Sequence, residues 1–173
     1  MPKIIENLEV RLIAEAKKQL EQSGYSALTI RSVAKGCGVG VGTVYNYFPS
    51  KEALLATYML ENWNACMERI QIASQTATEA KTVLHCIYTQ LLQYSEEHRA
   101  VFRDEAAASA FAGSFGHYHR LLRAQLAAPL RKFCESDFAA EFVAEALLVW
   151  TMAGKEFDDL YGVLKKNLSE SIL

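Results

Sequence analysis

The sequence predicts an all-α protein of about nine helices, and three observations support this. Apolar residues recur at helical spacing along almost the whole chain, beginning with Ile4, Leu8, Leu12, Ala16 and Leu20. No segment alternates strictly between apolar and polar residues, and no β-hairpin turn signal occurs. Apolar residues make up 51% of the 173 positions and charged residues 22%, which is typical of folded globular proteins.

The first 50 residues are expected to form three helices. The first covers residues 4–22, and Gly24 stops it. Thr29 is a suitable N-cap for a short second helix that ends near Gly36 to Gly38. A third short helix then leads to Phe48.

The stretch from Ile30 to Phe48 has the pattern of a helix-turn-helix. Such a unit needs a small residue where two helices cross and a residue that tolerates left-handed geometry in the turn. Ala34 and Gly38 meet these two needs. The inward apolar positions are Val33, Cys37, Val39, Val44, and Tyr47 or Phe48. The outward positions would face the major groove of DNA, and they are Gly40, Val41, Thr43, Tyr45 and Asn46.

The remaining residues are expected to form a helical body, which divides the chain into domains at 1–49 and 50–173. Ser50, after Pro49, would cap a long helix that reaches about residue 73. Further helices are expected at 78–95, 98–112, 114–135 with a break near Pro129, 138–153, and 156–169 after a separation at Gly154.

The charge distribution favours a partner that carries phosphates, and the spacing of the cysteines and histidines argues against disulfides and metal sites. The net charge is −2, yet residues 1–55 hold seven Lys or Arg against five Glu, which suits a head that faces phosphates. The four cysteines and four histidines lack disulfide or metal-ligand spacing, so no metal and no other cofactor is expected. No apolar stretch is long enough to span a membrane and no signal peptide opens the chain, which predicts a soluble cytoplasmic protein.

The helix-turn-helix stretch resembles the DNA-binding signature of the TetR family of bacterial regulators over about 30 residues. The matching residues are Gly24, Thr29, Ile30, Ala34, Gly38, Val39, Gly42, Thr43, Tyr45, Tyr47, Phe48, Ser50, Lys51 and Leu54. The resemblance implies phosphate contacts by Thr29, Tyr45, Tyr47 and Lys51, base-edge contacts by Gly40, Val41, Thr43 and Asn46, and supporting contacts by Arg31 and Lys35. Gly40 and Val41 stand where the family commonly has polar residues, so base contacts are expected to be few.

The body is rich in residues that suit a cavity for a small hydrophobic or aromatic effector, although each is also an ordinary core residue. The candidates are Trp63, Cys66, Tyr88, Phe102, Phe111, Phe115, Tyr118 and Trp150. The last two helices are expected to pair with a second copy of the chain, because two heads on a twofold axis can address a palindrome. The expected dimer residues are Phe142, Ala146, Leu147, Trp150, Phe157, Leu160, Tyr161 and Leu164.

Three classes of function fit the sequence to different degrees. The resemblance implies a repressor that binds a palindromic operator as a homodimer and is released by a small-molecule effector. An alternative is a DNA-binding protein that acts through a protein partner without an effector. An enzyme is disfavoured, because the sequence has no nucleophile elbow and no H-E-x-x-H motif, and its glycine cluster lacks the Gly-Lys-Ser/Thr of a phosphate loop.

Overall fold

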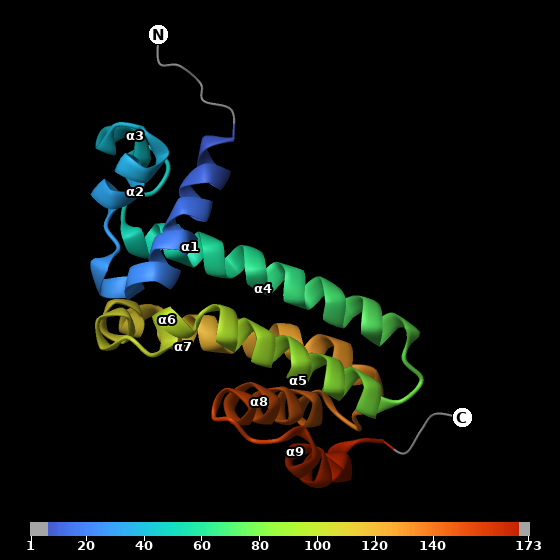
Figure 1. Cartoon of the computed structure of the whole chain (residues 1–173). Helices are drawn as coiled ribbons and strands as arrows, with labels where there is room; N and C mark the ends of the chain where they lie inside the picture. The colour runs from blue at the N-terminus through green and yellow to red at the C-terminus, as the bar shows by residue number, and fades with distance from the viewer. Residues whose placement is uncertain (1–6, 170–173) are drawn as a thin grey trace. The chain divides into compact units, whose positions relative to one another are not determined.

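The computed structural model describes residues 7–169, apart from the side chains of Ser114 and Phe115, and their regular elements are all helices (Figure 1). The predicted all-α class of about nine helices is confirmed. The elements are α1 (Leu8–Ala27), α2 (Ile30–Cys37), α3 (Val41–Tyr45), α4 (Lys51–Thr76), α5 (Ala80–Glu97), α6 (Arg99–Phe102), α7 (Glu105–Ala127), the 3-10 helix η1 (Ala128–Phe133), α8 (Asp137–Met152), α9 (Phe157–Leu164) and the 3-10 helix η2 (Lys165–Asn167). The start of the first predicted helix, residues 4–6, lies outside the described residues.

The contacts of the chain divide it into two compact units. The first unit contains the residues up to 62 together with 98–113, and the second contains 63–97 and the residues from 114 on. Helices α4 and α7 therefore each contribute residues to both units. The predicted division at residue 49 is a division by function, and it stays a prediction.

In the first unit, α1 presents one buried stripe to the core. Leu8, Leu12, Ile13, Ala16 and Leu20 are all buried, as the helical spacing predicts. Gly24 has φ 77° and ψ 173°, so the helical path is interrupted there, and helical hydrogen bonding resumes to Ala27. The predicted stop at Gly24 is thus a kink.

The turn between α2 and α3 is a helix-turn-helix with the expected residues at the crossing. Ala34 is buried, and its carbonyl oxygen accepts the N–H of Val39 at 3.0 Å. Gly38 has φ 67°, a left-handed conformation that favours glycine. Val44 and Phe48 are buried whereas Tyr47 is exposed, which settles the alternative of Tyr47 or Phe48 in favour of Phe48.

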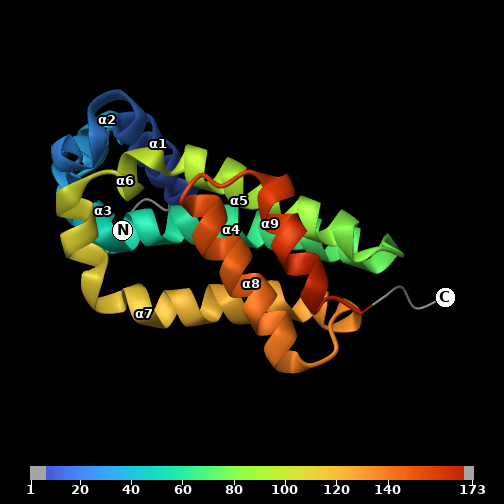
Figure 2. The same ribbon diagram turned by 90° about the horizontal axis from the view of Figure 1, so that it is seen from below.

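The second unit is built around α5, which packs against α8 and α9. Figure 2 shows α8 and α9 side by side after the turn at Gly154, whose φ of 78° again favours glycine. The core of the second unit contains residues from α4, α5, α7, η1, α8 and α9, among them Trp63, Ile87, Leu126 and Leu147. Helix α9 ends earlier than expected, at Leu164, and η2 follows it.

The helices predicted at 98–112 and 114–135 are wrong in their boundaries. A short α6 ends at Phe102, and α7 then runs through Gly113 and Gly116 without a break. Asp104 accounts for the new start, because its Oδ1 accepts the N–H groups of Ala106 and Ala107 at 2.9 and 3.0 Å. The break near Pro129 is confirmed, since α7 ends at Ala127 and η1 contains Pro129.

Candidate nucleic-acid interface

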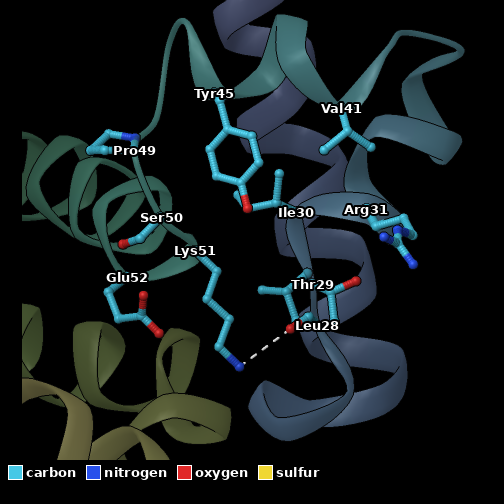
Figure 3. Close-up of a pocket in the computed structure, with 10 residues that line it drawn as sticks. All are labelled: Leu28, Thr29, Ile30, Arg31, Val41, Tyr45, Pro49, Ser50, Lys51 and Glu52. Carbon is cyan, nitrogen blue, oxygen red and sulfur yellow. Dashed lines mark hydrogen bonds between the residues drawn. The ribbon is translucent and has the colours of Figure 1, made fainter.

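A pocket of about 490 Å³ lies in the first unit where α2 and α4 begin (Figure 3). Its walls come from the residues before α2, the first turn of α2, helix α3 and the start of α4. The lining residues are Leu28, Thr29, Ile30, Arg31, Val41, Tyr45, Pro49, Ser50, Lys51 and Glu52. The pocket therefore brings α2, α3 and the start of α4 together at one place.

Two capped helix N-termini meet at this pocket. Thr29 Oγ1 accepts the N–H of Ser32 at 3.0 Å, and Ser32 Oγ accepts the N–H of Thr29 at 3.1 Å, which forms a capping box. Ser50 Oγ accepts the N–H of Ala53 at 3.2 Å. First-turn amides lack partners inside their helix and carry the positive end of its dipole. Together with Arg31, this arrangement favours an anion such as a phosphate.

The ammonium group of Lys51 is held in place by the chain itself. Its Nζ donates to the carbonyl oxygens of Tyr25 and Leu28 at 3.0 and 3.3 Å, and it lies 3.9 Å from the centre of the Tyr25 ring. Figure 3 shows the side chain extended toward Leu28. Because an ammonium group has three N–H bonds, the two carbonyl oxygens use two of them.

Tyr25 and Glu52 form a second connection behind the pocket. The Tyr25 hydroxyl donates to Glu52 Oε1 at 2.8 Å. Burial raises the pKa of Tyr25, and the hydrogen bond to the negative Glu52 raises this pKa further. Burial also acts to raise the pKa of Glu52, but the hydrogen bond from Tyr25 and the charge of Lys51 help to bring it below its ordinary value. A neutral tyrosine therefore pairs with a carboxylate at neutral pH and joins α1 to α4.

Helix α3 exposes the positions that were predicted to face bases. Gly40 and Asn46 are exposed, and Val41 and Thr43 are half-buried. Tyr45 is 52% exposed, and its hydroxyl points toward the start of α2 (Figure 3). Val44, on the opposite side of the helix, is buried and anchors α3 to the core.

The pocket collects some of the predicted phosphate ligands and leaves out others. Thr29, Tyr45 and Lys51 line it, and so does Arg31, which was predicted as a supporting residue. Tyr47 and Lys35 are exposed but do not line it. The contacts of all these residues with DNA stay predictions.

Sequence reasoning missed the part of the pocket that depends on Tyr25 and Glu52. The two residues are 27 positions apart, and no local pattern connects them. A tyrosine directly after Gly24 and an acidic residue in the first turn of the helix that Ser50 caps were the only signals that the sequence offered.

The residues predicted to line an effector cavity are not brought together. Trp63, Cys66 and Tyr88 are buried in the core of the second unit, where the indole N–H of Trp63 donates to Gln125 Oε1 at 2.6 Å. Phe102 and Phe111 belong to the first unit, and Tyr118 and Trp150 are exposed. The side chain of Phe115 lies outside the described residues. None of the other seven lines the pocket where α2 and α4 begin.

The residues predicted for a dimer interface also fall into two groups. Leu147, Phe157, Leu160 and Leu164 are buried in the core of their own chain. Ala146 and Tyr161 are half-buried, and Phe142 and Trp150 are 47% and 49% exposed. Only the exposed members are free to contact a second copy.

The described residues give no sign of a metal site or of a membrane-spanning helix. Between residues 7 and 169, no three His, Cys, Asp or Glu side chains are arranged to hold a metal ion. No helix in that range is both long and apolar enough to cross a bilayer. The four cysteines are free, and burial raises the pKa of each thiol.

Known DNA-binding regulators match the part of the chain that forms the helix-turn-helix. Residues 12–58 match the family model of the bacterial regulatory proteins, tetR family. The chain is 31% identical over 91 residues to the uncharacterized HTH-type transcriptional regulator YuxN of Bacillus subtilis, a match that covers 53% of this chain. The matched part is 31% of YuxN, so the chain spans about a third of the length of this relative.

Solved structures share the fold over nearly the whole chain. The TetR family repressor AlkX from Dietzia, implicated in biodegradation of n-alkanes, superposes with a TM-score of 0.64 at 17% identity, covering 92% of this chain and 98% of AlkX. The regulator FadR of Bacillus subtilis, in complex with stearoyl-CoA, superposes with a TM-score of 0.55 at 19% identity, covering 92% of this chain and 97% of FadR. At such identities the likeness shows the fold alone.

Proposed function

We propose that this chain, whose helix-turn-helix belongs to the TetR family of bacterial regulators, represses transcription as a homodimer and is released from its operator by a small-molecule effector. Its general role is that of a DNA-binding transcriptional regulator. Repression, the palindromic operator, the dimer and the effector are our proposal, as is a non-enzymatic role in the cytoplasm.

The pocket in the first unit is the observation that carries the proposal. Thr29, Arg31, Tyr45 and Lys51 supply hydroxyl and cationic groups around two helix N-termini, which suits the oxygens of a DNA phosphate. Helix α3 borders this pocket through Val41 and Tyr45. A backbone phosphate in the pocket would therefore place the exposed side of α3 against the major groove.

The surface of α8 supports a homodimer. Phe138, Phe142, Val149 and Met152 lie at helical spacing on one side of α8 and are 78%, 47%, 41% and 38% exposed. Four large apolar side chains on one exposed helix face are typical of a protein interface. Two heads held in this way would bind two half-sites of a palindrome, whereas one five-residue helix makes few base contacts.

Support for the effector comes from the fold relatives. FadR holds stearoyl-CoA and AlkX is described as a repressor, and both share the fold of this chain. We propose that a small hydrophobic effector prefers a dimer in which the two α3 helices are wrongly spaced for DNA. Such a preference shifts the population away from the DNA-bound state.

The test is a pull-down of genomic fragments by the full chain, sequenced with and without a panel of lipophilic compounds. The proposal predicts a short palindrome that one compound releases. Enrichment of a palindrome that no compound releases would overturn the effector, and no enrichment at low salt would overturn the whole proposal.

The pocket is tested by the salt dependence of binding to that palindrome. Arg31→Gln should weaken binding and reduce the slope of log K against log salt by about one per lost phosphate contact. Lys166→Gln is the matched control, because it removes one exposed positive charge from the second unit. Equal slopes for Arg31→Gln and Lys166→Gln would contradict the phosphate pocket.

A further inference from the structure

A second pocket lies entirely within the second unit and has a different character. Its volume is about 430 Å³, which lies in the range of small-molecule sites. Its walls come from the start of α5, from η1, from the end of α9 and η2, and from the chain after η2. The lining residues are Ala77, Thr78, Glu79, Ala80, Lys81, Lys132, Phe133, Tyr161, Lys165, Leu168 and Ser169.

The pocket carries an excess of positive charge. Lys81, Lys132 and Lys165 line it, and Glu79 is its only acidic lining residue. None of the three lysines forms an ion pair with a described residue. Helix α5, 18 residues long, begins at Ala80 in the pocket wall, so the positive end of its dipole adds to this charge.

Two of the lysines are placed by contacts that leave donors available. Lys132 Nζ donates to the carbonyl oxygens of Ser74 and Ala77, the second at 3.2 Å, and it lies 4.6 Å from the centre of the Phe133 ring. One of its three N–H bonds is therefore left. Lys81 Nζ lies 4.9 Å from the centre of the Tyr161 ring. Ammonium groups above aromatic rings place a cationic surface directly beside an apolar one.

The rest of the wall is fixed by backbone pairing. The N–H of Ser169 donates to the carbonyl oxygen of Phe133 at 2.9 Å, and Cys134 and Leu168 form an isolated antiparallel bridge. Ser74 Oγ donates to the carbonyl oxygen of Pro129 at 3.0 Å, which ties the end of α4 to η1. The pocket is thus formed before any ligand binds, which reduces the ordering that binding requires.

We propose that this pocket binds a small organic anion, whose carboxylate or phosphate group contacts Lys81, Lys132 and Lys165 and whose apolar part lies against Phe133 and Tyr161. Carboxylates and phosphates share the negative oxygens that ammonium groups bind. This proposal does not depend on the proposed release of DNA by a hydrophobic effector. It concerns other residues, and its test measures the binding of the anion without DNA.

The experiment titrates the full-length protein with benzoate, phenyl phosphate and the neutral benzyl alcohol. Binding is followed by calorimetry and by the amide NMR signals of Lys81 and Ser169. At least one anion should bind with a millimolar or lower dissociation constant and shift these signals, while benzyl alcohol should not. The tighter of the two anions identifies the carboxylate or the phosphate as the preferred group.

Variants connect that binding to the lysines. Lys81→Gln and Lys165→Gln should each raise the dissociation constant at least about fivefold. Lys166→Gln removes the same charge from the neighbouring exposed residue, which does not line the pocket, and should leave the constant unchanged. Failure of both anions to bind, equal binding of benzyl alcohol, or equal losses in Lys165→Gln and Lys166→Gln would overturn the proposal.

Discussion

Tyr25 fixes the positions of two residues that line the pocket where α2 and α4 begin. Its ring supports the Lys51 ammonium, its carbonyl oxygen accepts from that group, and its hydroxyl donates to Glu52. One buried residue thus sets the positions of two pocket residues on α4. No pattern in the sequence connects it with either, because the contacts form only after α1 and α4 have packed.

Tyr25 should make stability depend on alkaline pH. Because burial and Glu52 raise its pKa, the folded chain keeps the hydroxyl proton at a pH where the unfolded chain releases it. The stability from this difference is fully present below about pH 10 and is lost as the pH rises further. Urea unfolding of Tyr25→Phe should show a smaller loss between pH 9.5 and 11.5 than the wild type, as measured in ~0.5-unit steps.

The same variant should be less stable at neutral pH by about 1 kcal/mol, because Glu52 loses a hydrogen bond. Tyr47→Phe is the control, since Tyr47 is exposed, and its pH profile should follow that of the wild type. Parallel profiles for Tyr25→Phe and the wild type would contradict the assignment.

Two glycines of the helix-turn-helix should respond to alanine with opposite signs. Gly38 has φ 67°, so Gly38→Ala should lower the free energy of unfolding by about 1–2 kcal/mol. Gly42 is helical and a Cβ there meets no atom within 4 Å, so Gly42→Ala should raise it by up to about 1 kcal/mol. Chemical denaturation measures both, and a change of the same sign in the two variants would contradict this reading.

At the scale of helices, local signals predicted most boundaries and failed where a capping residue was missed. Thr29 and Ser50 correctly predicted the starts of α2 and α4, and Gly154 correctly predicted the separation between α8 and α9. Asp104 caps α7, and the alanine-rich segment after it keeps the helix intact through Gly113. A boundary was predicted at residue 113, although a helix tolerates one glycine for about 1 kcal/mol.

The capping box of α2 should be measurable as stability. Thr29→Ala removes the acceptor for the Ser32 N–H and should lower the free energy of unfolding by about 1 kcal/mol, whereas Thr29→Ser should retain most of it. Thr89→Ala is the control, because Thr89 is exposed inside α5 and its hydroxyl bonds only the carbonyl oxygen of His85. If Thr29→Ala and Thr89→Ala unfold at the same urea concentration, the box contributes nothing.

At the scale of the molecule, periodicity predicted which helices exist but not which of their faces remain exposed. Leu147 and Leu160 were expected at a dimer interface, yet they fill the core of their own unit. Spacing alone could not separate the two faces of α8, because apolar residues occur all around it. The aromatic residues predicted to line one effector cavity likewise lie in two separate cores and on the surface. The sequence could not distinguish these places, since cores and ligand cavities use the same residue types.

The exposed stripe of α8 has a charged residue that bears on the dimer. Glu145 lies between Phe142 and Val149, and its carboxylate contacts His119 at 2.9 Å and Arg123 at 3.7 Å, both on α7. The Arg123 guanidinium offsets its charge, and the His119 ring is within hydrogen-bond distance of the same carboxylate, so the apolar residues around it remain suited to burial against a second copy. Phe142 is the central apolar residue of this stripe.

Phe142→Glu should therefore convert the dimer into a monomer, which sedimentation equilibrium measures. The substitution places a third carboxylate beside Glu141 and Glu145, and burying this charge in an interface that excludes water is unfavourable. Its helix content should remain that of the wild type, since Phe142 is 47% exposed within its own chain. Ile72→Glu, at a 57% exposed position on α4, should remain a dimer. A dimeric Phe142→Glu protein would show that α8 is not the interface, and a wild type that is already monomeric would show that two heads are not joined through these residues.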